Sequence, residues 1–158
     1  MSNKNEATEQ KWMVKNMVDR RDHFFRVENV VGVGTFDTFY TIMGTSGWIE
    51  IKAPREPARP GSKLFASNHK FSQEQKNFAL QHTKAGGTCW GFIGTDLRQM
   101  LIPAKFIETA NDATVDELLA VSAWSRLKYS NSARLDARRL RFVLAKLPYQ
   151  PEPHEGLK

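Results

Sequence analysis

The sequence is poor in cysteine and lacks long hydrophobic runs. Cys89 is the single cysteine among 158 residues, so no internal disulfide can form, which fits a reducing compartment. Cys89 lies in the apolar run 88–93, and this setting favours a buried structural thiol over a nucleophile. No run is long enough to span a bilayer, and residues 2–10 are polar rather than signal-like. We therefore expect a cytoplasmic protein without a membrane partner.

Three common kinds of site are also absent from the sequence. The histidines lack zinc-ligand spacing to one another or to Cys89. Gly32 and Gly34 are followed by no helical pattern and no later glycine, so they do not form a nucleotide-binding fingerprint. No serine lies in a nucleophile-elbow motif. These absences argue against a zinc site, a Rossmann-type cofactor and a serine hydrolase.

The composition is that of an ordinary globular domain with an excess of positive charge. Hydrophobic residues make up 41% of the chain and charged residues 25%, which is typical of soluble proteins. A chain of this length can bury a sizeable core as one domain. The net charge of +6 suits a polyanionic partner such as nucleic acid, although charge alone identifies none.

The hydrophobic periodicity alternates between helical and strand-like segments. It predicts helices over residues 8–21, 72–86, 114–123 and 132–147. It predicts strands over residues 24–31, 36–43, 48–53, 88–93 and 99–102. This order indicates a single α/β domain over residues 1–147. The segment 148–158 is rich in proline and is predicted to be a flexible tail.

A long basic segment separates the third predicted strand from the next helix. Residues 54–60 contain three prolines and two arginines, which excludes a helix or a central strand. We therefore predict a loop over 54–70, and loops of this length in compact domains are often functional. Ser72 and Gln75 have the spacing of a capping box, which predicts the start of the following helix.

The strand 48–53 carries an unusual pair of charges. Alternate residues of a strand point to one face, so Ile49 and Ile51 point into a core while Glu50 and Lys52 share the other face. Buried charges are tolerated when they are paired or bound to a metal. A simple salt bridge on an edge strand is the alternative interpretation.

Asp37, on the preceding strand, is predicted to lie on the same face. A turn at residues 44–47 would pair Met43 with Trp48 and Thr41 with Glu50. Counting back in steps of two from Thr41 reaches Asp37. In that register Asp37 lies about four residues, or roughly 13 Å, from the position opposite Glu50. A shared metal ion would then require a bent strand or a bulge.

Two carboxylates and a lysine at one point suit phosphodiester hydrolysis. Carboxylate oxygens bind Mg²⁺ or Mn²⁺ and leave water in the coordination shell. The ion would activate a water and neutralise charge on the phosphate. The lysine would orient that water or stabilise the transition-state oxygens.

The ordered set of motifs resembles a known nuclease family. Asp37 followed by Glu50-Ile51-Lys52 resembles the PD-(D/E)XK signature. The segments 32–37, 47–52, 71–75 and 85–87 together are similar to the VRR-type (virus-type replication-repair) nucleases, which are often small phage proteins. The resemblance covers about residues 8–104, and leaves 105–147 as a C-terminal helical extension. It implies a restriction-endonuclease-like fold, with a central mixed β-sheet flanked by helices.

The resemblance also assigns roles to residues. Asp37 and Glu50 would bind the metal together with the Ile51 carbonyl, and Lys52 would be the catalytic lysine. Gln75 would face the site, which is a second interpretation beside its capping role. Phe36 occupies the position where the family usually has proline, a residue that shapes the turn without taking part in the chemistry.

The family has one further acidic residue, and two candidates for it remain open. Glu9 matches the family's first helix and shares a helix face with Met13 and Met17. Glu28 lies on a predicted strand, close to Asp37 in sequence. A solvated carboxylate is the alternative for either residue.

Basic residues near these motifs are candidate DNA contacts. The first group comprises Arg26 and the loop residues Arg55, Arg59, Lys63, His69 and Lys70. The second group shares a face of the last predicted helix: Arg134, Arg138 and Arg141. A solvated helix face is the more usual explanation of such a second group.

Two hypotheses follow for the function. The first is a Mg²⁺- or Mn²⁺-dependent DNA endonuclease, which by resemblance would be a homodimer that cuts branched DNA in the manner of a Holliday junction resolvase. A two-fold dimer would present two active sites to two symmetric strands. A phage-encoded enzyme would act in the host cytoplasm. The second is a non-catalytic phage protein that binds nucleic acid on a nuclease-like fold.

Overall fold

The computed structural model describes residues 4–27, 34–65 and 69–150. Its helices are α1 (Lys4–Asn16), α2 (Gln73–Lys84), η1 (Ala104–Phe106), α3 (Ile107–Ala110), α4 (Val115–Val121) and α5 (Ala133–Leu144). Its strands are β1 (His23–Arg26), β2 (Thr38–Ile42), β3 (Thr45–Lys52), β4 (Cys89–Gly94), β5 (Arg98–Pro103) and β6 (Trp124–Leu127). Of these, β6, η1 and α3 were not predicted from the sequence.

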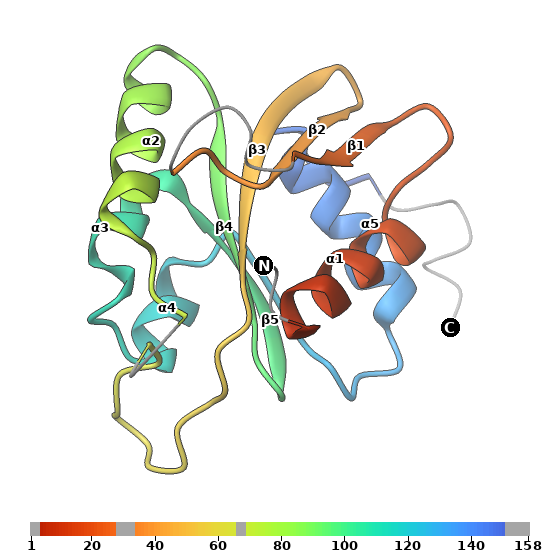
Figure 1. Cartoon of the computed structure of the whole chain (residues 1–158). Helices are drawn as coiled ribbons and strands as arrows, with labels where there is room; N and C mark the ends of the chain where they lie inside the picture. Colours follow the sequence, from red (N-terminus) through yellow and green to blue (C-terminus); the bar gives the residue numbers. More distant parts are fainter. Residues whose placement is uncertain (1–3, 28–33, 66–68, 151–158) are drawn as a thin grey trace.

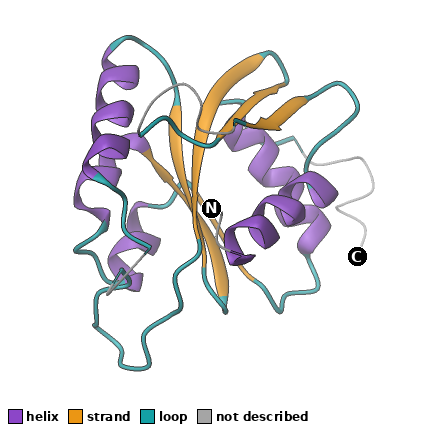
Figure 2. Ribbon diagram, in the orientation of Figure 1, coloured by secondary structure: helices purple, strands orange, loops and turns teal. Residues whose placement is uncertain are grey.

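The strands form one six-stranded sheet in the order in which they occur along the chain. The β3–β4 pair is parallel and is connected through α2, whereas the other neighbouring pairs are antiparallel. Helices α2, α3 and α4 lie on one side of the sheet, and α1 and α5 lie on the other (Figure 1 and Figure 2). The expected fold class, an α/β domain with a mixed sheet flanked by helices, is confirmed.

The β2–β3 hairpin differs from the predicted one. Its turn consists of Met43 and Gly44, with φ angles of 50° and 83°, and Ile42 pairs with Thr45. Two-residue turns with positive φ at both positions match the twist of antiparallel strands. The predicted turn at 44–47 and the predicted pairing of Thr41 with Glu50 are therefore wrong. The true pairing shifts the register by four residues, which preserves the side-chain parity.

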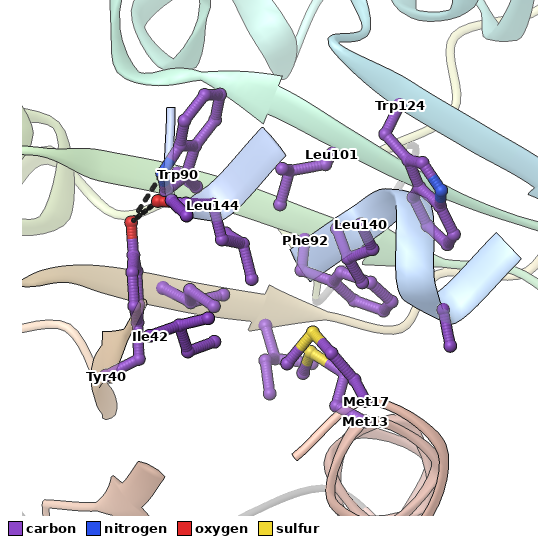
Figure 3. Close-up of a cluster of buried hydrophobic side chains, with 14 residues drawn as sticks. Met13, Met17, Tyr40, Ile42, Trp90, Phe92, Leu101, Trp124, Leu140 and Leu144 are labelled. Atoms are coloured by element: carbon purple, nitrogen blue, oxygen red, sulfur yellow. Dashed lines mark hydrogen bonds between the residues drawn. The ribbon is translucent and has the colours of Figure 1, made fainter. Parts of the chain in front are cut away.

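Gly47 lies inside β3 rather than in the turn. It pairs with Tyr40, and a Cβ atom at Gly47 would lie 2.5 Å from the Tyr40 hydroxyl. Tyr40 is fully buried; its hydroxyl accepts from Trp90 Nε1 at 2.9 Å and donates to the Leu144 carbonyl at 3.1 Å (Figure 3). Burial raises the pKa of the Tyr40 hydroxyl, so it remains a donor. This contact connects β2, β4 and the end of α5.

Each face of the sheet has its own hydrophobic core. The core under α1 and α5 contains Met13, Met17, Ile42, Phe92, Leu101 and Leu140, which Figure 3 shows between the sheet and the two helices. The opposite core contains Phe36, Phe65, Phe71, Ile93, Met100 and Ile107. Cys89 is buried in this second core, and desolvation raises the pKa of its thiol to about 12. The predicted structural thiol is confirmed.

The helix boundaries follow local sequence signals. Ser72 and Gln75 form the predicted capping box of α2, and Thr114 and Glu117 form another at α4. Gly86, with φ of 88°, follows the C-terminus of α2. In the described part of the chain, no helix is long and apolar enough to cross a membrane.

The segment after residue 104 is integrated into the fold. Strand β6 pairs with β5 and forms one edge of the sheet. It was missed because its four residues alternate between buried and exposed without a long apolar pattern. Helix α5 completes the first core. Residues 151–158 of the predicted flexible tail lie outside the described residues.

We expect Tyr40→Phe to destabilise the fold by about 1–3 kcal/mol, because the variant leaves the buried Trp90 N–H without an acceptor. Urea denaturation monitored by circular dichroism measures this difference. Tyr129→Phe is the matched control, because Tyr129 is 80% exposed, and its unfolding free energy should change by less than about 0.5 kcal/mol. Equal effects of the two substitutions would contradict the role assigned to Tyr40.

Candidate active site

The true hairpin register brings Asp37 directly to Glu50. Thr38 pairs with Ile49, so continuing the register by one residue places Asp37 opposite Glu50. The Asp37 backbone N–H donates to Glu50 Oε2 at 3.3 Å. The expected separation of four residues is thus removed by the four-residue shift in register, and neither a bend nor a bulge is needed. The predicted parity of Asp37 and Glu50 is correct.

Glu50 and Lys52 form a buried pair on a central strand. Their residues are 5% and 8% exposed, and Lys52 Nζ lies 3.2 Å from Glu50 Oε1. The ammonium also lies over the ring of Phe71, 5.5 Å from its centroid. Because β3 has neighbours on both sides, the alternative of a surface salt bridge on an edge strand is wrong.

Gln75 combines its two predicted interpretations. Its Oε1 accepts from the Ser72 N–H at 2.9 Å, which is the capping contact. Its Nε2 donates to Glu50 Oε1. The same side chain therefore caps α2 and holds the Glu50 carboxylate, because a planar amide offers an acceptor and a donor on opposite sides. The start of α2 is positioned over the site by this contact.

Asp37 lies at the mouth of the site. Its side chain is 16% exposed, and Arg26 Nη2 lies 3.4 Å from its Oδ2. Thr38 donates to Asp37 Oδ1 at 3.0 Å. These two partners orient the carboxylate from β1 and β2, whereas Glu50 is oriented from β3 and α2.

Burial perturbs the acidity of both carboxyls. Desolvation, followed by the charge of Asp37, raises the pKa of Glu50 to about 7 from an ordinary value of 4.5. Desolvation likewise raises the pKa of Asp37, and the charge of Glu6 adds to the shift. Two neighbouring buried carboxyls of this kind disfavour simultaneous ionisation unless a cation lies close to them.

Glu9, one of the two candidates for the third acidic residue, is engaged by other partners. Glu9 is buried, accepts from Gln99 Nε2 at 2.5 Å and forms an ion pair with Lys128. Among the described residues there is no group of three or more His, Cys, Asp or Glu side chains that could hold a metal. Glu28, the other candidate, lies outside the described residues.

Glu6 is the α1 carboxylate whose charge acts on Asp37. The sequence reasoning did not consider it. The available signal was its position three residues before Glu9, because residues three apart share a helix face. The family pattern specified only that an acidic residue belongs to the first helix, and this does not distinguish two glutamates one turn apart.

The candidate DNA contacts of the loop differ in solvent exposure. Arg55, Arg59 and Lys70 are exposed, whereas His69 is partly buried. Lys63 forms an ion pair with Asp112 at 2.7 Å. The loop leaves β3 directly after Lys52 and returns at α2, so both of its ends adjoin the candidate site (Figure 1).

The second basic group lies on α5, on the side of the sheet opposite α2 (Figure 1). Arg141 donates to the Met17 carbonyl at 2.7 Å and forms an ion pair with Asp22, so it connects α5 to the segment after α1. Arg138 donates to the Gln150 carbonyl at 3.0 Å, and Arg134 is exposed. The structure does not bring this group to Asp37 and Glu50.

Comparison with known proteins yields distant structural similarities and no match to a family or to a curated protein. Among solved structures, this chain is similar to Hjc, a Holliday junction resolvase from the archaeal hyperthermophile Archaeoglobus fulgidus. The identity is 14%, the TM-score is 0.43, and the similarity covers 66% of this chain and 78% of that chain.

The raised pKa of Glu50 predicts a pH-dependent stability without added metal. Between pH 4.5 and about 7 the unfolded chain loses this proton while the folded protein keeps it, so stability falls as the pH rises. Glu50→Gln removes this dependence. We expect the stability of the variant relative to the parent to rise by on the order of 3 kcal/mol across this window.

Urea denaturation in chelator-containing buffer, repeated across this pH range, measures the difference. Glu108→Gln, at an exposed carboxylate, is the control and should show no such trend. A difference between Glu50→Gln and the parent that is constant with pH would contradict the prediction.

Proposed function

We propose that this protein is a metal-dependent DNA endonuclease, with its active site at Asp37, Glu50, Lys52 and Gln75. The observation that carries the proposal is the placement of Asp37 against Glu50, beside a buried lysine. The Asp37 backbone N–H donates to the Glu50 carboxylate, and the charge of Asp37 raises the pKa of Glu50. The motif resemblance to PD-(D/E)XK nucleases of the VRR type agrees with it, because the residues of the motif are the ones that meet.

The donor set fits a hard divalent cation such as Mg²⁺ or Mn²⁺. Carboxylate oxygens are the ligands that these ions prefer. Desolvation, and after it the charge of a neighbouring carboxylate, raises the pKa of Asp37 and of Glu50, so both ionised forms are disfavoured and a cation between them would stabilise them. A cation there would lower the pKa of a water and neutralise charge on a phosphate.

The Ile51 carbonyl is a candidate third ligand. The Trp48 N–H donates to Thr88, which precedes β4, so the backbone groups of Trp48 point toward β4. Backbone groups alternate between the two edges of a strand, which directs those of Ile51 toward β2. The β2–β3 pairing ends at Ile49. The Ile51 carbonyl therefore has no partner in β2, and it lies on the edge of β3 that faces Asp37.

Lys52 and Gln75 would prepare the reacting groups. Lys52 Nζ, held by Glu50 and Phe71, would stabilise negative charge that develops on the phosphate oxygens. Gln75 Nε2 would keep the Glu50 carboxylate oriented toward the cation. The buried position of the pair limits access of bulk water, which strengthens these electrostatic interactions.

The proposed substrate is DNA, in a branched form such as a four-way junction. The basis for the branched form and for a homodimer is the resemblance to VRR-type nucleases. The loop residues Arg55, Arg59, Lys63, His69 and Lys70, together with Arg26, would contact the phosphates around the site. The group on α5, Arg134, Arg138 and Arg141, lies across the sheet and would meet DNA only at a second contact surface.

Cleavage assays test the enzyme directly. Labelled four-way junction, linear duplex and single-stranded DNA are incubated with Mg²⁺ or Mn²⁺, and the products are resolved by denaturing electrophoresis. We expect metal-dependent cleavage by the parent, and a loss on the order of 10²-fold or more for Glu50→Gln and for Lys52→Met. Lys84→Met, at an exposed position near the end of α2, is the control and should cut like the parent.

DNA binding, measured in Ca²⁺ by electrophoretic mobility, separates the two hypotheses. Intact binding without cleavage of any substrate would favour the non-catalytic nucleic-acid-binding protein. If Lys52→Met cuts as fast as the parent, the assignment of the lysine is wrong. Cleavage confined to linear DNA would contradict the proposed branched substrate.

Metal binding has a readout that does not depend on activity. Excess Mn²⁺ should raise the unfolding temperature of the parent, by an amount that corresponds to about 2.7 kcal/mol at one hundred times the dissociation constant. The shift should disappear in Asp37→Asn and persist in Asp116→Asn, a surface variant on α4. Calorimetric unfolding scans measure it, and an equal shift in both variants would place the metal elsewhere.

A further inference from the structure

A row of aromatic side chains crosses the sheet beside the carboxylates. Phe25, Phe39 and Trp48 are cross-strand neighbours on β1, β2 and β3. Their ring centroids are 5.4 Å and 5.1 Å apart, and Phe78 of α2 continues the series 5.7 Å from Trp48. These four residues are called the aromatic row below. The site proposed above uses none of them.

The aromatic row shares its face of the sheet with Asp37 and Glu50. Phe39 and Asp37 are two residues apart on the β2 side, as are Trp48 and Glu50 on β3. Side chains two residues apart point to the same face, and the two rows are separated by about 7 Å. A nucleotide next to a phosphate at Glu50 therefore lies within reach of the aromatic row.

One end of the aromatic row is open to solvent. Phe25 is 40% exposed, and the other three side chains are partly buried. Phe24 and Tyr40, which alternate with the row along β1 and β2, belong to the core under α1 and α5. Those helices cover the opposite face of these strands (Figure 1). Trp48 and Phe78 pack against the second core, whereas Phe25 and Phe39 belong to neither core. Exposed apolar surface that continues from a core in this way is typical of an interaction site.

The polar side chains that border the aromatic row are two histidines and an arginine, which suit a nucleic-acid partner. His23 lies 4.7 Å from Phe25 at one end, and His82 stacks on Phe78 at 5.6 Å at the other. Arg26 follows Phe25 and reaches Asp37. The row itself contains no carboxylate. Aromatic faces bordered by basic groups are the arrangement with which proteins bind unpaired nucleic-acid strands.

We propose that the aromatic row is a stacking platform for unpaired bases of the DNA strand that enters the active site. The inference rests on the proposed nuclease function and makes its substrate more specific. It implies DNA with unpaired nucleotides beside the cleaved bond, as at a fork or a distorted branch point, in preference to continuous duplex. A second protein copy is disfavoured as the occupant, because a chain that covered the row would also cover Asp37.

Binding measurements in Ca²⁺ and without catalytic metal test the platform. The probes are a forked DNA with unpaired arms and a blunt duplex of equal length, with affinity followed by fluorescence anisotropy. We expect the parent to bind the fork more tightly than the duplex. Phe25→Leu and Phe39→Leu keep apolar volume but remove the stacking surface, and each should weaken fork binding about tenfold to a hundredfold while leaving duplex binding unchanged.

Control variants separate stacking from folding. Phe106→Leu, at a partly buried phenylalanine of η1, should bind both DNAs like the parent. Phe25→Trp restores a larger ring at the most exposed position of the row and should retain fork binding. If Phe25→Leu binds the fork as tightly as the parent, or loses fork and duplex binding equally, the proposal is overturned.

Two further results distinguish this inference from the proposed function. Fork preference is measured without cleavage. If the parent prefers the fork but cuts no DNA, and Phe25→Leu loses that preference, the platform is supported and the nuclease function is contradicted. An active nuclease without fork preference contradicts the platform alone. Sedimentation equilibrium adds a third arm: a dimer that dissociates in Phe25→Leu, with unchanged fork binding, would assign the row to a protein interface and overturn the proposal.

Discussion

The candidate site depends on the register of the β2–β3 hairpin. A two-residue turn at Met43 and Gly44 sets this register, because both positions have positive φ and the next pair, Ile42 and Thr45, closes directly over them. The positions of the candidate-site side chains on the α2 side of the sheet follow from that pairing. Asp37 reaches Glu50, and the aromatic side chains form a row two residues away. The predicted turn at residues 44–47, which is centred two residues further along the chain, would have separated the carboxylates by four residues while leaving their parity unchanged.

The two faces of the sheet differ in the side chains that they bury. Under α1 and α5 the strands contribute aliphatic and aromatic side chains to a closed core, with the Tyr40 hydroxyl joined to Trp90 and Leu144. On the other face, the same strands place Glu50 and Lys52 under the start of α2. The raised pKa of Glu50 shows that this burial works against its ionised form. The closed core on the first face therefore offsets the unfavourable burial of charged side chains on the second face.

Helix α2 connects the fold to the proposed chemistry. It is the crossover between the parallel strands β3 and β4, so its N-terminus lies near the end of β3 that carries Glu50 and Lys52. The capping box fixes Gln75 at this N-terminus, and the same amide donates to Glu50. Gln75 thus serves both as the capping residue of α2 and as the residue that positions the Glu50 carboxylate.

The sequence by itself determined the parity of the site. Strand alternation placed Glu50 and Lys52 on one face and Asp37 with them, and the Ser72–Gln75 spacing predicted the start of α2, since these patterns depend on neighbouring residues alone. Other features needed the tertiary structure. The turn residues were misassigned because Gly47 resembles a turn glycine, whereas the Tyr40 ring requires it within β3. Likewise, the separation of Glu9 from the carboxylate pair, and the influence of Glu6 on it, follow from how α1 packs on the sheet, which no local pattern encodes.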